Sequence, residues 1–235
     1  PIATAFTVTG AVVGVGLALG GAPAWAKYQE IVTLWVLVPF VGGGIAYATA
    51  RLLRSPSVPE RYAIPALAGL VGVILANVQF ALLGPAGEAA SIVEAAFIGT
   101  DLFDTVLPFQ VGISLAFALV GAALLRRDID RDPVAGQRHF LVVLGALVAF
   151  SAGGSQVGLA IGPLLPLLDD VSFTIPLVVV LVGGGLGLLA GSWTGAPRMI
   201  KTLSQDYSSL GPRRSIAALI PSFAIAQTAV FLGVP

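Results

Sequence analysis

Hydrophobic residues gather in seven continuous runs that are separated by short polar segments. Most of the runs are near the length of about 20 residues that a helix needs to cross the hydrocarbon core of a bilayer. They are continuous, and the strands of a membrane barrel would alternate between apolar and polar positions. The pattern predicts seven membrane segments, with re-entrant segments as the alternative for the first and last: Ile2–Leu19, Ile31–Ala50, Ile64–Leu83, Val106–Leu125, Phe140–Leu168, Phe173–Trp193 and Ile216–Val234.

The fifth run, Phe140–Leu168, is too long for one upright membrane helix. Its 29 residues would form a helix about 43 Å long, against a hydrocarbon core of about 30 Å. Gly153-Gly154-Ser155-Gln156 lies near its middle, so the sequence predicts a break there. In transporters such breaks commonly build the substrate site. The alternative is that the glycines, with Gly158 and Gly162, let a neighbouring helix pack closely.

Basic residues concentrate in every second loop, and none lies within an apolar run. The positive-inside rule therefore places the second, fourth and sixth loops in the cytoplasm. This alternation supports the segment count and predicts a multi-pass protein of the cell membrane. The basic residues of these three loops are Arg51, Arg54 and Arg61, then Arg126, Arg127, Arg131 and Arg138, then Arg198, Lys201, Arg213 and Arg214.

The third loop, Gly84 to Thr105, is long and acidic. Its middle, Ala89 to Ile98, predicts a short amphipathic helix, either a plain connecting element or a lid over an entrance. The amides Asn77, Gln79 and Gln110 lie within or next to apolar runs. We interpret them as groups that hydrogen-bond across helices and hold the bundle together.

The composition places the chain among integral membrane proteins. Of its residues 57% are hydrophobic and only 10% are charged, against about 25% charged in a soluble domain. The net charge is zero, which gives no reason to expect a nucleic-acid partner. The absence of cysteine excludes disulfides and thiolate metal sites, and we find no paired carboxylates, phosphate loop or metal cluster. We therefore expect neither an enzyme nor a cofactor.

The residues from Gly153 to Pro163 resemble the second copy of the signature of the inorganic phosphate transporter (PiT) family, which reads roughly G-A-N-D-V-A-N-A-x-G-P. The frame and the closing G-P match. The two asparagines and the aspartate are replaced by Ser155, Leu159 and Gln156.

The start of the chain, Pro1 to Gly16, is similar to the P-I-S-T-T-H motif of that family and the helix after it. Pro1 and Thr4 match, whereas Ala3, Ala5 and Phe6 replace the serine, a threonine and the histidine. Proline favours the first turn of a helix, and the free N–H groups of such a turn form an anion-binding arrangement. Thr4 and Thr7 can add hydroxyl donors, or they can bond back to their own helix.

A third resemblance covers Gly187 to Ala217, and the last residues, Phe231 to Pro235, resemble the approach to a second P-I-S-T-T-H. The chain has no initial Met and begins inside an apolar stretch. We therefore interpret it as the middle part of a longer transporter, a single membrane domain over 1–235. Residues 1–125 would hold the end of one repeat and the connecting helices, and residues 140–235 the start of the second repeat.

The resemblance implies an all-α, multi-span helical bundle with broken helices and re-entrant hairpins, within an inverted-repeat transporter. The implied substrate is inorganic phosphate, with sodium or protons as coupling ions, and sulfate or a related oxyanion is the alternative. A homodimer and a transport-inactive scaffold of the same fold also stay open. The implied substrate-binding residues are Thr4, Thr7, Gly153, Gly154, Ser155 and Gln156.

Two further expectations concern this site. Thr4 and Ser155 should approach each other near the middle of the bundle, because the two repeats share one substrate site. Coupling through this part of the protein should be weak, because no apolar run contains Asp, Glu, His, Lys or Arg, and such residues are the usual proton relays within membranes.

Overall fold

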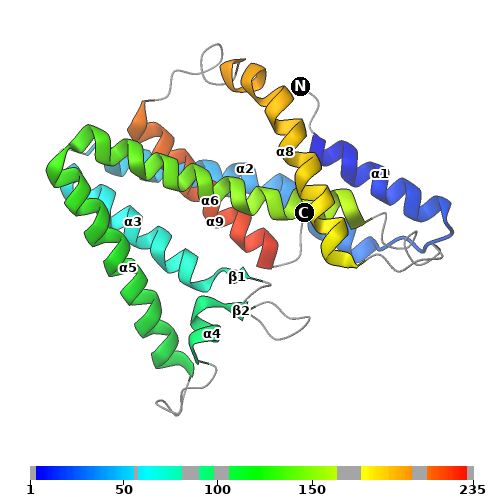
Figure 1. Ribbon diagram of the computed structural model, residues 1–235, viewed down its shortest axis with the longest axis horizontal. Helices are drawn as coiled ribbons and strands as arrows, with labels where there is room; N and C mark the ends of the chain where they lie inside the picture. Colours follow the sequence, from blue (N-terminus) through cyan, green and yellow to red (C-terminus); the bar gives the residue numbers. More distant parts are fainter. Residues whose placement is uncertain are drawn as a thin grey trace. The chain divides into compact units, whose positions relative to one another are not determined.

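The computed structural model describes residues 4–55, 58–80, 90–97, 106–162, 176–202 and 211–231, and these are mostly helical (Figure 1). Each predicted apolar run overlaps one long helix, so the expectation of a helical membrane protein is confirmed. These helices are α1 (Thr4–Ala18), α2 (Trp25–Leu53), α3 (Glu60–Asn77), α5 (Val106–Arg131), α6 (Pro133–Ile161), α8 (Leu177–Lys201) and α9 (Pro212–Phe231).

Four of the described helices are long and apolar enough to cross a membrane, namely α2, α5, α6 and α8. The apolar parts of α1 and α3 are shorter. The count of seven membrane segments therefore stays a prediction, although the seven helices lie where the pattern placed them.

The third loop also contains regular structure. Strand β1 (Gln79–Phe80) pairs antiparallel with β2 (Ala90–Ser91), and helix α4 (Ile92–Phe97) follows. The start of α4 is a capping box. The backbone N–H of Ser91 donates to Glu94 Oε2 at 2.7 Å, and the backbone N–H of Glu94 donates to Ser91 Oγ at 3.1 Å. Two otherwise unpaired donors are thereby satisfied, and the short helix predicted in this loop is confirmed.

The predicted break at Gly153-Gly154-Ser155-Gln156 is wrong. Helix α6 is continuous from Pro133 to Ile161 and includes all four residues. Glycine inside a helix costs about 1 kcal/mol relative to alanine. A break in a membrane leaves unpaired backbone groups at several kcal/mol each. The continuous helix therefore costs less than the break. Residues 163–168, the end of the predicted run, lie outside the described residues.

The chain divides into two compact units. The first comprises residues 1–37, 149–210 and 233–235, and the second comprises 38–148 and 211–232. Helices α2 and α6 each contribute residues to both units, and α2 contains Pro39 in its interior. The repeat boundaries expected from the sequence stay a prediction.

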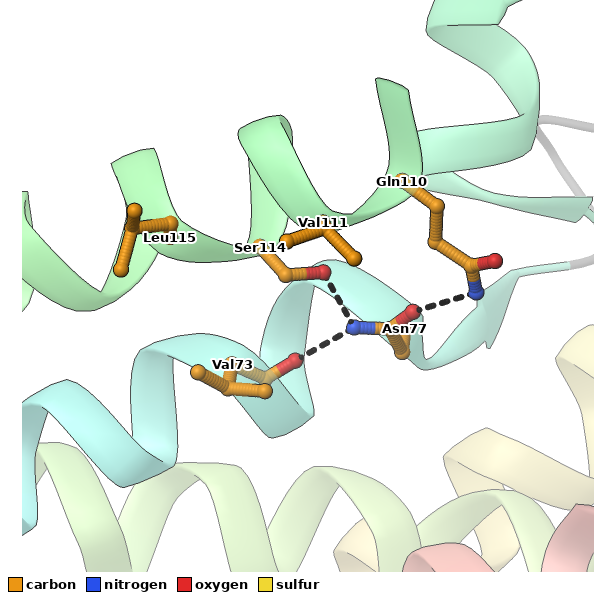
Figure 2. A pocket seen from close by; sticks show the side chains of 6 residues that line it. All are labelled: Val73, Asn77, Gln110, Val111, Ser114 and Leu115. Carbon is orange, nitrogen blue, oxygen red and sulfur yellow. Dashed lines mark hydrogen bonds between the residues drawn. The ribbon is translucent and has the colours of Figure 1, made fainter. Parts of the chain in front are cut away.

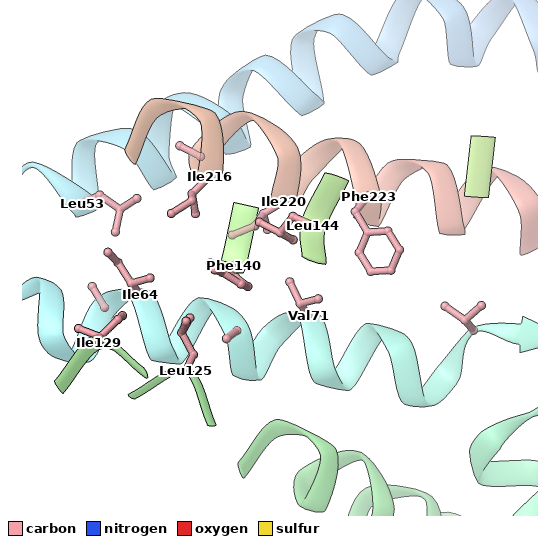
Figure 3. Packing of buried hydrophobic residues seen from close by; sticks show 14 residues of the cluster. Leu53, Ile64, Val71, Leu125, Ile129, Phe140, Leu144, Ile216, Ile220 and Phe223 are labelled. Atoms are coloured by element: carbon pink, nitrogen blue, oxygen red, sulfur yellow. The ribbon is translucent and has the colours of Figure 1, made fainter. Parts of the chain in front are cut away.

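A hydrophobic cluster holds the second unit together (Figure 3). It gathers buried side chains from α2, α3, α5, α6 and α9, and its fully buried members include Ile64, Leu144, Ile216 and Phe223. These side chains are buried because the five helices pack against one another, and this packing holds the helices in place within the second unit.

Helices α3 and α5 pack backbone to backbone because glycine stands at their contact. A Cβ atom added at Gly72 would lie 2.5 Å from the carbonyl oxygen of Phe117. One added at Gly121 would lie 3.0 Å from the carbonyl oxygen of Ala68. Small residues of this kind allow close helix approach in membranes.

The turn between α5 and α6 consists of Asp132 alone. Its Oδ1 accepts hydrogen bonds from the backbone N–H groups of Val134 at 2.9 Å and Ala135 at 3.1 Å. Across the same turn, His139 Nδ1 lies 2.7 Å from Asp128 Oδ2. The carboxylate of Asp132 therefore caps the N-terminus of α6, as such side chains commonly do.

Candidate functional site

The predicted site residues of the first unit lie on α1 and α6. Thr4 is the first residue of α1, and Thr7 lies one turn later with an exposed side chain. Pro1, Ile2 and Ala3, the start of the resembling motif, are outside the described residues, as is the side chain of Thr4. A helix that begins at Thr4 directs its free N–H groups back toward those residues. This is the orientation that the anion-binding hypothesis requires.

Thr9, which the sequence interpretation left out, has a hydroxyl oxygen that is buried without a hydrogen-bond partner among the described residues. Buried hydroxyls are nearly always hydrogen-bonded to protein or water. An unsatisfied hydroxyl on α1 therefore belongs with Thr4 and Thr7 as a candidate donor. Sequence alone gave no signal for it, because threonines that face the protein and the lipid look the same in an apolar run.

Gly153, Gly154, Ser155 and Gln156 occupy consecutive positions of α6. Their backbone groups are inside a continuous helix, where each N–H is used by the helix itself. Successive residues point about 100° apart, so Gly153 and Gln156 share a face and Gly154 and Ser155 point elsewhere. Gln156 is half-buried, and the side chain of Ser155 is outside the described set. The expected approach of Ser155 to Thr4 therefore stays a prediction.

The packing alternative for Gly158 and Gly162 is not supported. No described atom lies within 4 Å of a Cβ built at either glycine. The close contact between α6 and α8 comes from Gly184 of α8, whose added Cβ would lie 2.7 Å from Ile161 Cδ1 and 3.4 Å from Val157 Cγ1. Gln156 neighbours this contact, because it directly precedes Val157.

Ser151 of α6 is, after Thr9, a second residue that the sequence did not indicate. Its side chain is buried, with 7% exposed, and it has an interaction partner. It stands one helical turn before Ser155, so the two serines share a face of α6.

The second unit has a polar cluster between α3 and α5 (Figure 2). Asn77 Nδ2 donates to the carbonyl oxygen of Val73 at 2.9 Å and to Ser114 Oγ at 2.8 Å, and Gln110 Nε2 donates to Asn77 Oδ1 at 3.1 Å. The interpretation of Asn77 and Gln110 as cross-helix hydrogen bonders is confirmed. Gln79 instead lies in β1, and its side chain is outside the described set.

An open pocket of about 370 Å³ adjoins this cluster. Both amide hydrogens of Asn77 are used in the hydrogen bonds above, so the main role of the cluster is to hold α3 against α5. The remaining pocket walls are apolar. The residues that line it are Val73, Asn77, Gln110, Val111, Ser114 and Leu115.

Comparisons with known proteins extend over the whole chain. The chain is 27% identical to the chloroplastic inorganic phosphate transporter 2-1 of Arabidopsis thaliana, with all of this chain and 46% of that protein aligned. It is 25% identical to a putative phosphate permease of Pyrococcus furiosus, with 59% of that protein aligned. It is 26% identical to one of Chlamydia pneumoniae, with 62% aligned.

The chain thus spans about half to three-fifths of the length of these curated relatives. No solved structure matches it. The model of the phosphate transporter family matches residues 1–235, and the match includes the regions of Thr4 and of Gly153 to Pro163 on which the resemblance was based. This chain belongs to the phosphate transporter family.

Proposed function

We propose that the full-length protein moves inorganic phosphate across the cell membrane by alternating access, as a secondary transporter and not as an enzyme. The observation that carries the proposal is the family match over all 235 residues. The relatives named above are phosphate transporters or permeases by name. The long apolar helices support the membrane setting.

The substrate site in this proposal uses neutral donors. All of its proposed residues on α1 and α6 are uncharged, namely Thr4, Thr7, Gly153, Gly154, Ser155 and Gln156. A phosphate ion can be bound by hydroxyls, amides and helix N-termini without a positively charged side chain. Thr9 supports this reading, because its buried hydroxyl lacks a partner among the described groups.

The continuous course of α6 changes the role that we propose for Gly153 and Gly154. In the described conformation they offer no free backbone N–H, so α6 contributes its side chains, from Ser155 and Gln156. The glycines would contribute only if α6 opens at this point during the transport cycle. Alternating access provides such a second conformation, since the site faces the two sides of the membrane in turn.

Uptake by the full-length protein in liposomes tests the proposal directly. We expect uptake of labelled phosphate that unlabelled phosphate competes with and that sulfate competes with more weakly. Preferential uptake of sulfate would assign the protein to the oxyanion alternative. Absence of uptake of either anion, from folded protein, would favour the transport-inactive scaffold.

A further inference from the structure

Nine arginines lie at the ends of five helices of the second unit. They are at the end of α2, the start of α3, the end of α5, the start of α6 and the start of α9. These residues are Arg51, Arg54, Arg61, Arg126, Arg127, Arg131, Arg138, Arg213 and Arg214. We call this set the arginine surface. All nine are exposed, and lysine is absent from the set.

The hydrophobic cluster of the second unit brings these five ends together. Each end contributes buried cluster members that stand within three residues of an arginine of the surface (Figure 3). The arginine surface is therefore one feature of the folded unit, and it borders the apolar lengths of the membrane-crossing candidates α2, α5 and α6. The cluster members concerned are Leu53, Ala63, Ile64, Leu125, Ile129, Phe140 and Ile216.

Among the described residues, three aspartates near these helix ends offset part of the charge of the arginine surface. Asp128 contacts His139, and Asp132 caps α6. Asp130 lies 3.9 Å from Arg126, a long ion pair between exposed groups. The nine arginines outnumber these aspartates, so the described part of the surface keeps a net positive charge next to the apolar lengths of the helices.

Two of the arginines meet at one aromatic ring. The guanidinium carbon of Arg61 lies 4.7 Å from the ring centroid of Tyr62, and that of Arg126 lies 5.2 Å from the same centroid. Arg61 Nη2 also lies 2.7 Å from the Tyr62 hydroxyl oxygen, to which it donates. Tyr62 thus holds guanidinium groups from α3 and α5 in place. A fixed guanidinium presents the donor fork that matches phosphate oxygens.

An apolar track leads from this ring to the pocket between α3 and α5. Val73 follows Tyr62 by 11 positions, and Leu115 precedes Arg126 by 11. In an α-helix this spacing returns to within about 20° of the same face and moves about 16 Å along the axis. Leu119 and Leu115 lie along this side of α5, with 62% and 56% of their side chains exposed. The pocket of about 370 Å³ ends the track.

The length of the track matches one leaflet. Half of a hydrocarbon core of about 30 Å is about 15 Å, which is close to the distance from the ring to the pocket. A molecule that fits both ends must carry a phosphate at the membrane surface and an apolar chain that reaches the midplane. A soluble anion would use the arginines and leave the track empty.

We propose that this site binds an anionic phospholipid, with its headgroup phosphate at Arg61 and Arg126 and one acyl chain along α5 into the pocket. Such attraction is worth about a fivefold change in binding constant per arginine near the membrane surface. Asn77, Gln110 and Ser114, which hydrogen-bond to one another, line the pocket that would receive the end of the chain. The site shares no residue with the phosphate-binding site proposed on α1 and α6.

Lipid binding to the purified full-length protein tests this, with phosphatidylglycerol and phosphatidylcholine of identical acyl chains as probes. Retained lipid is measured by native mass spectrometry, and affinity by titration in detergent. We expect selective retention of phosphatidylglycerol by the unmodified protein. The double variant Arg61→Gln and Arg126→Gln should lower that affinity by about 25-fold. The variant with lysine at both positions should recover part of it, because the charge is kept and the fork is lost.

The matched control is Arg138→Gln with Arg214→Gln, which removes the same charge from the arginine surface on other helices. We expect this control to lower the affinity by clearly less than the Arg61 and Arg126 variant does, because it removes surface charge but no guanidinium at the proposed headgroup site. If the two double variants lost the same affinity for phosphatidylglycerol, the arginines would attract the lipid only by their total charge, and the proposal would be overturned. Displacement of the lipid by excess inorganic phosphate would also overturn it, since the arginines would then bind the free anion.

The acyl-chain position is tested with a tryptophan at Leu115 and lipids brominated near the chain terminus. We expect additional quenching, relative to the protein without this tryptophan, that is greater for brominated phosphatidylglycerol than for brominated phosphatidylcholine. Equal quenching by the two lipids would show that no anionic lipid occupies the track. These readouts need no transport activity, so they stand apart from the test of phosphate uptake.

Discussion

Asn77 makes three hydrogen bonds, of which two join α3 to α5 and one stays within α3. In a membrane an amide of this kind has no water to replace a lost partner. Measured values for interhelical hydrogen bonds nevertheless average only about 0.6 kcal/mol, because the unfolded chain in the membrane also finds partners. The residue therefore matters more for the specific pairing of α3 with α5 than for overall stability.

Replacing Asn77 with Ala should lower the free energy of unfolding of the full-length protein by about 1 kcal/mol, since two cross-helix bonds are lost. Denaturant titration in detergent measures this. The control is Ser222→Ala on α9, whose hydroxyl donates only to the carbonyl oxygen of Ala218 in its own helix. We expect little change there, and an equally large effect in both variants would contradict the assigned role of Asn77.

Gly72 and Gly112 offer a sharper comparison. A Cβ atom added at Gly72 would lie 2.5 Å from the carbonyl oxygen of Phe117, a backbone atom that cannot shift easily. A Cβ atom added at Gly112 would have no described atom within 4 Å. We expect Gly72→Ala to destabilise the protein by about 1–3 kcal/mol through overpacking. Gly112→Ala should be neutral or stabilising by up to about 1 kcal/mol. Thermal unfolding compares the two, and similar results would mean that α3 and α5 do not pack this closely.

Gln156 stands where the family signature has an aspartate, and it can neither titrate nor offer a charged ligand to sodium. We expect sodium dependence of phosphate uptake to be weak in the unmodified protein and stronger with Gln156→Asp. Uptake assays over a series of sodium concentrations measure this. Steep sodium dependence that Gln156→Ala abolishes would show that Gln156 already serves the coupling ion.

At the scale of the helix, the sequence predicted where helices lie better than where they end. Continuous apolar runs correspond to the seven long helices because burial in lipid requires paired backbone groups. The ends depend on local partners. Helix α3 ends at Asn77, six residues before the run does, and β1 follows almost at once to pair with β2. Helix α6 begins at Pro133, seven residues before its run, because Asp132 caps it.

The candidate site was less predictable than the helices. Motif positions indicated Thr4, Ser155 and Gln156, but a motif does not tell which side of a helix a residue faces. The burial of Ser151 and the unsatisfied hydroxyl of Thr9 follow from three-dimensional packing. The break predicted at Gly153 and Gly154 is wrong because glycine lowers helix stability only slightly. A broken helix in a membrane costs more, since its backbone groups lose their partners.

Replacing both Gly153 and Gly154 with Ala tests the role of α6 as an element. The structure gives each new methyl group open space among the described atoms. We therefore expect unchanged or higher stability, with a gain of up to about 1 kcal/mol per site. Phosphate uptake should fall if α6 opens here during transport. Gly145→Ala in the same helix, where space is also open, is the control for uptake, and full activity in the double variant would rule out the opening.

At the scale of the whole molecule, the division into two units cuts across the repeat boundaries expected from the sequence. The first unit takes residues from both expected repeats, as does the second. The sequence does not indicate this interleaving, because an apolar run shows that a helix forms and does not show which other helices it packs against. It is consistent with a substrate site that draws on α1 and α6, since both contribute to the first unit.

Two of the boundaries between the units fall inside the helices α2 and α6, so the chain passes from one unit to the other there without a loop. In α2 the boundary falls at Leu37 and Val38, directly before Pro39 and the run Gly42 to Gly44. Proline removes one backbone hydrogen bond from a helix, and glycine stiffens it least. In α6 the boundary after Val148 precedes Gly153 and Gly154 by one turn. The five glycines and the proline nearest these boundaries are thus the positions at which α2 and α6 bend most easily, and we propose that the motion of a transport cycle bends the chain there.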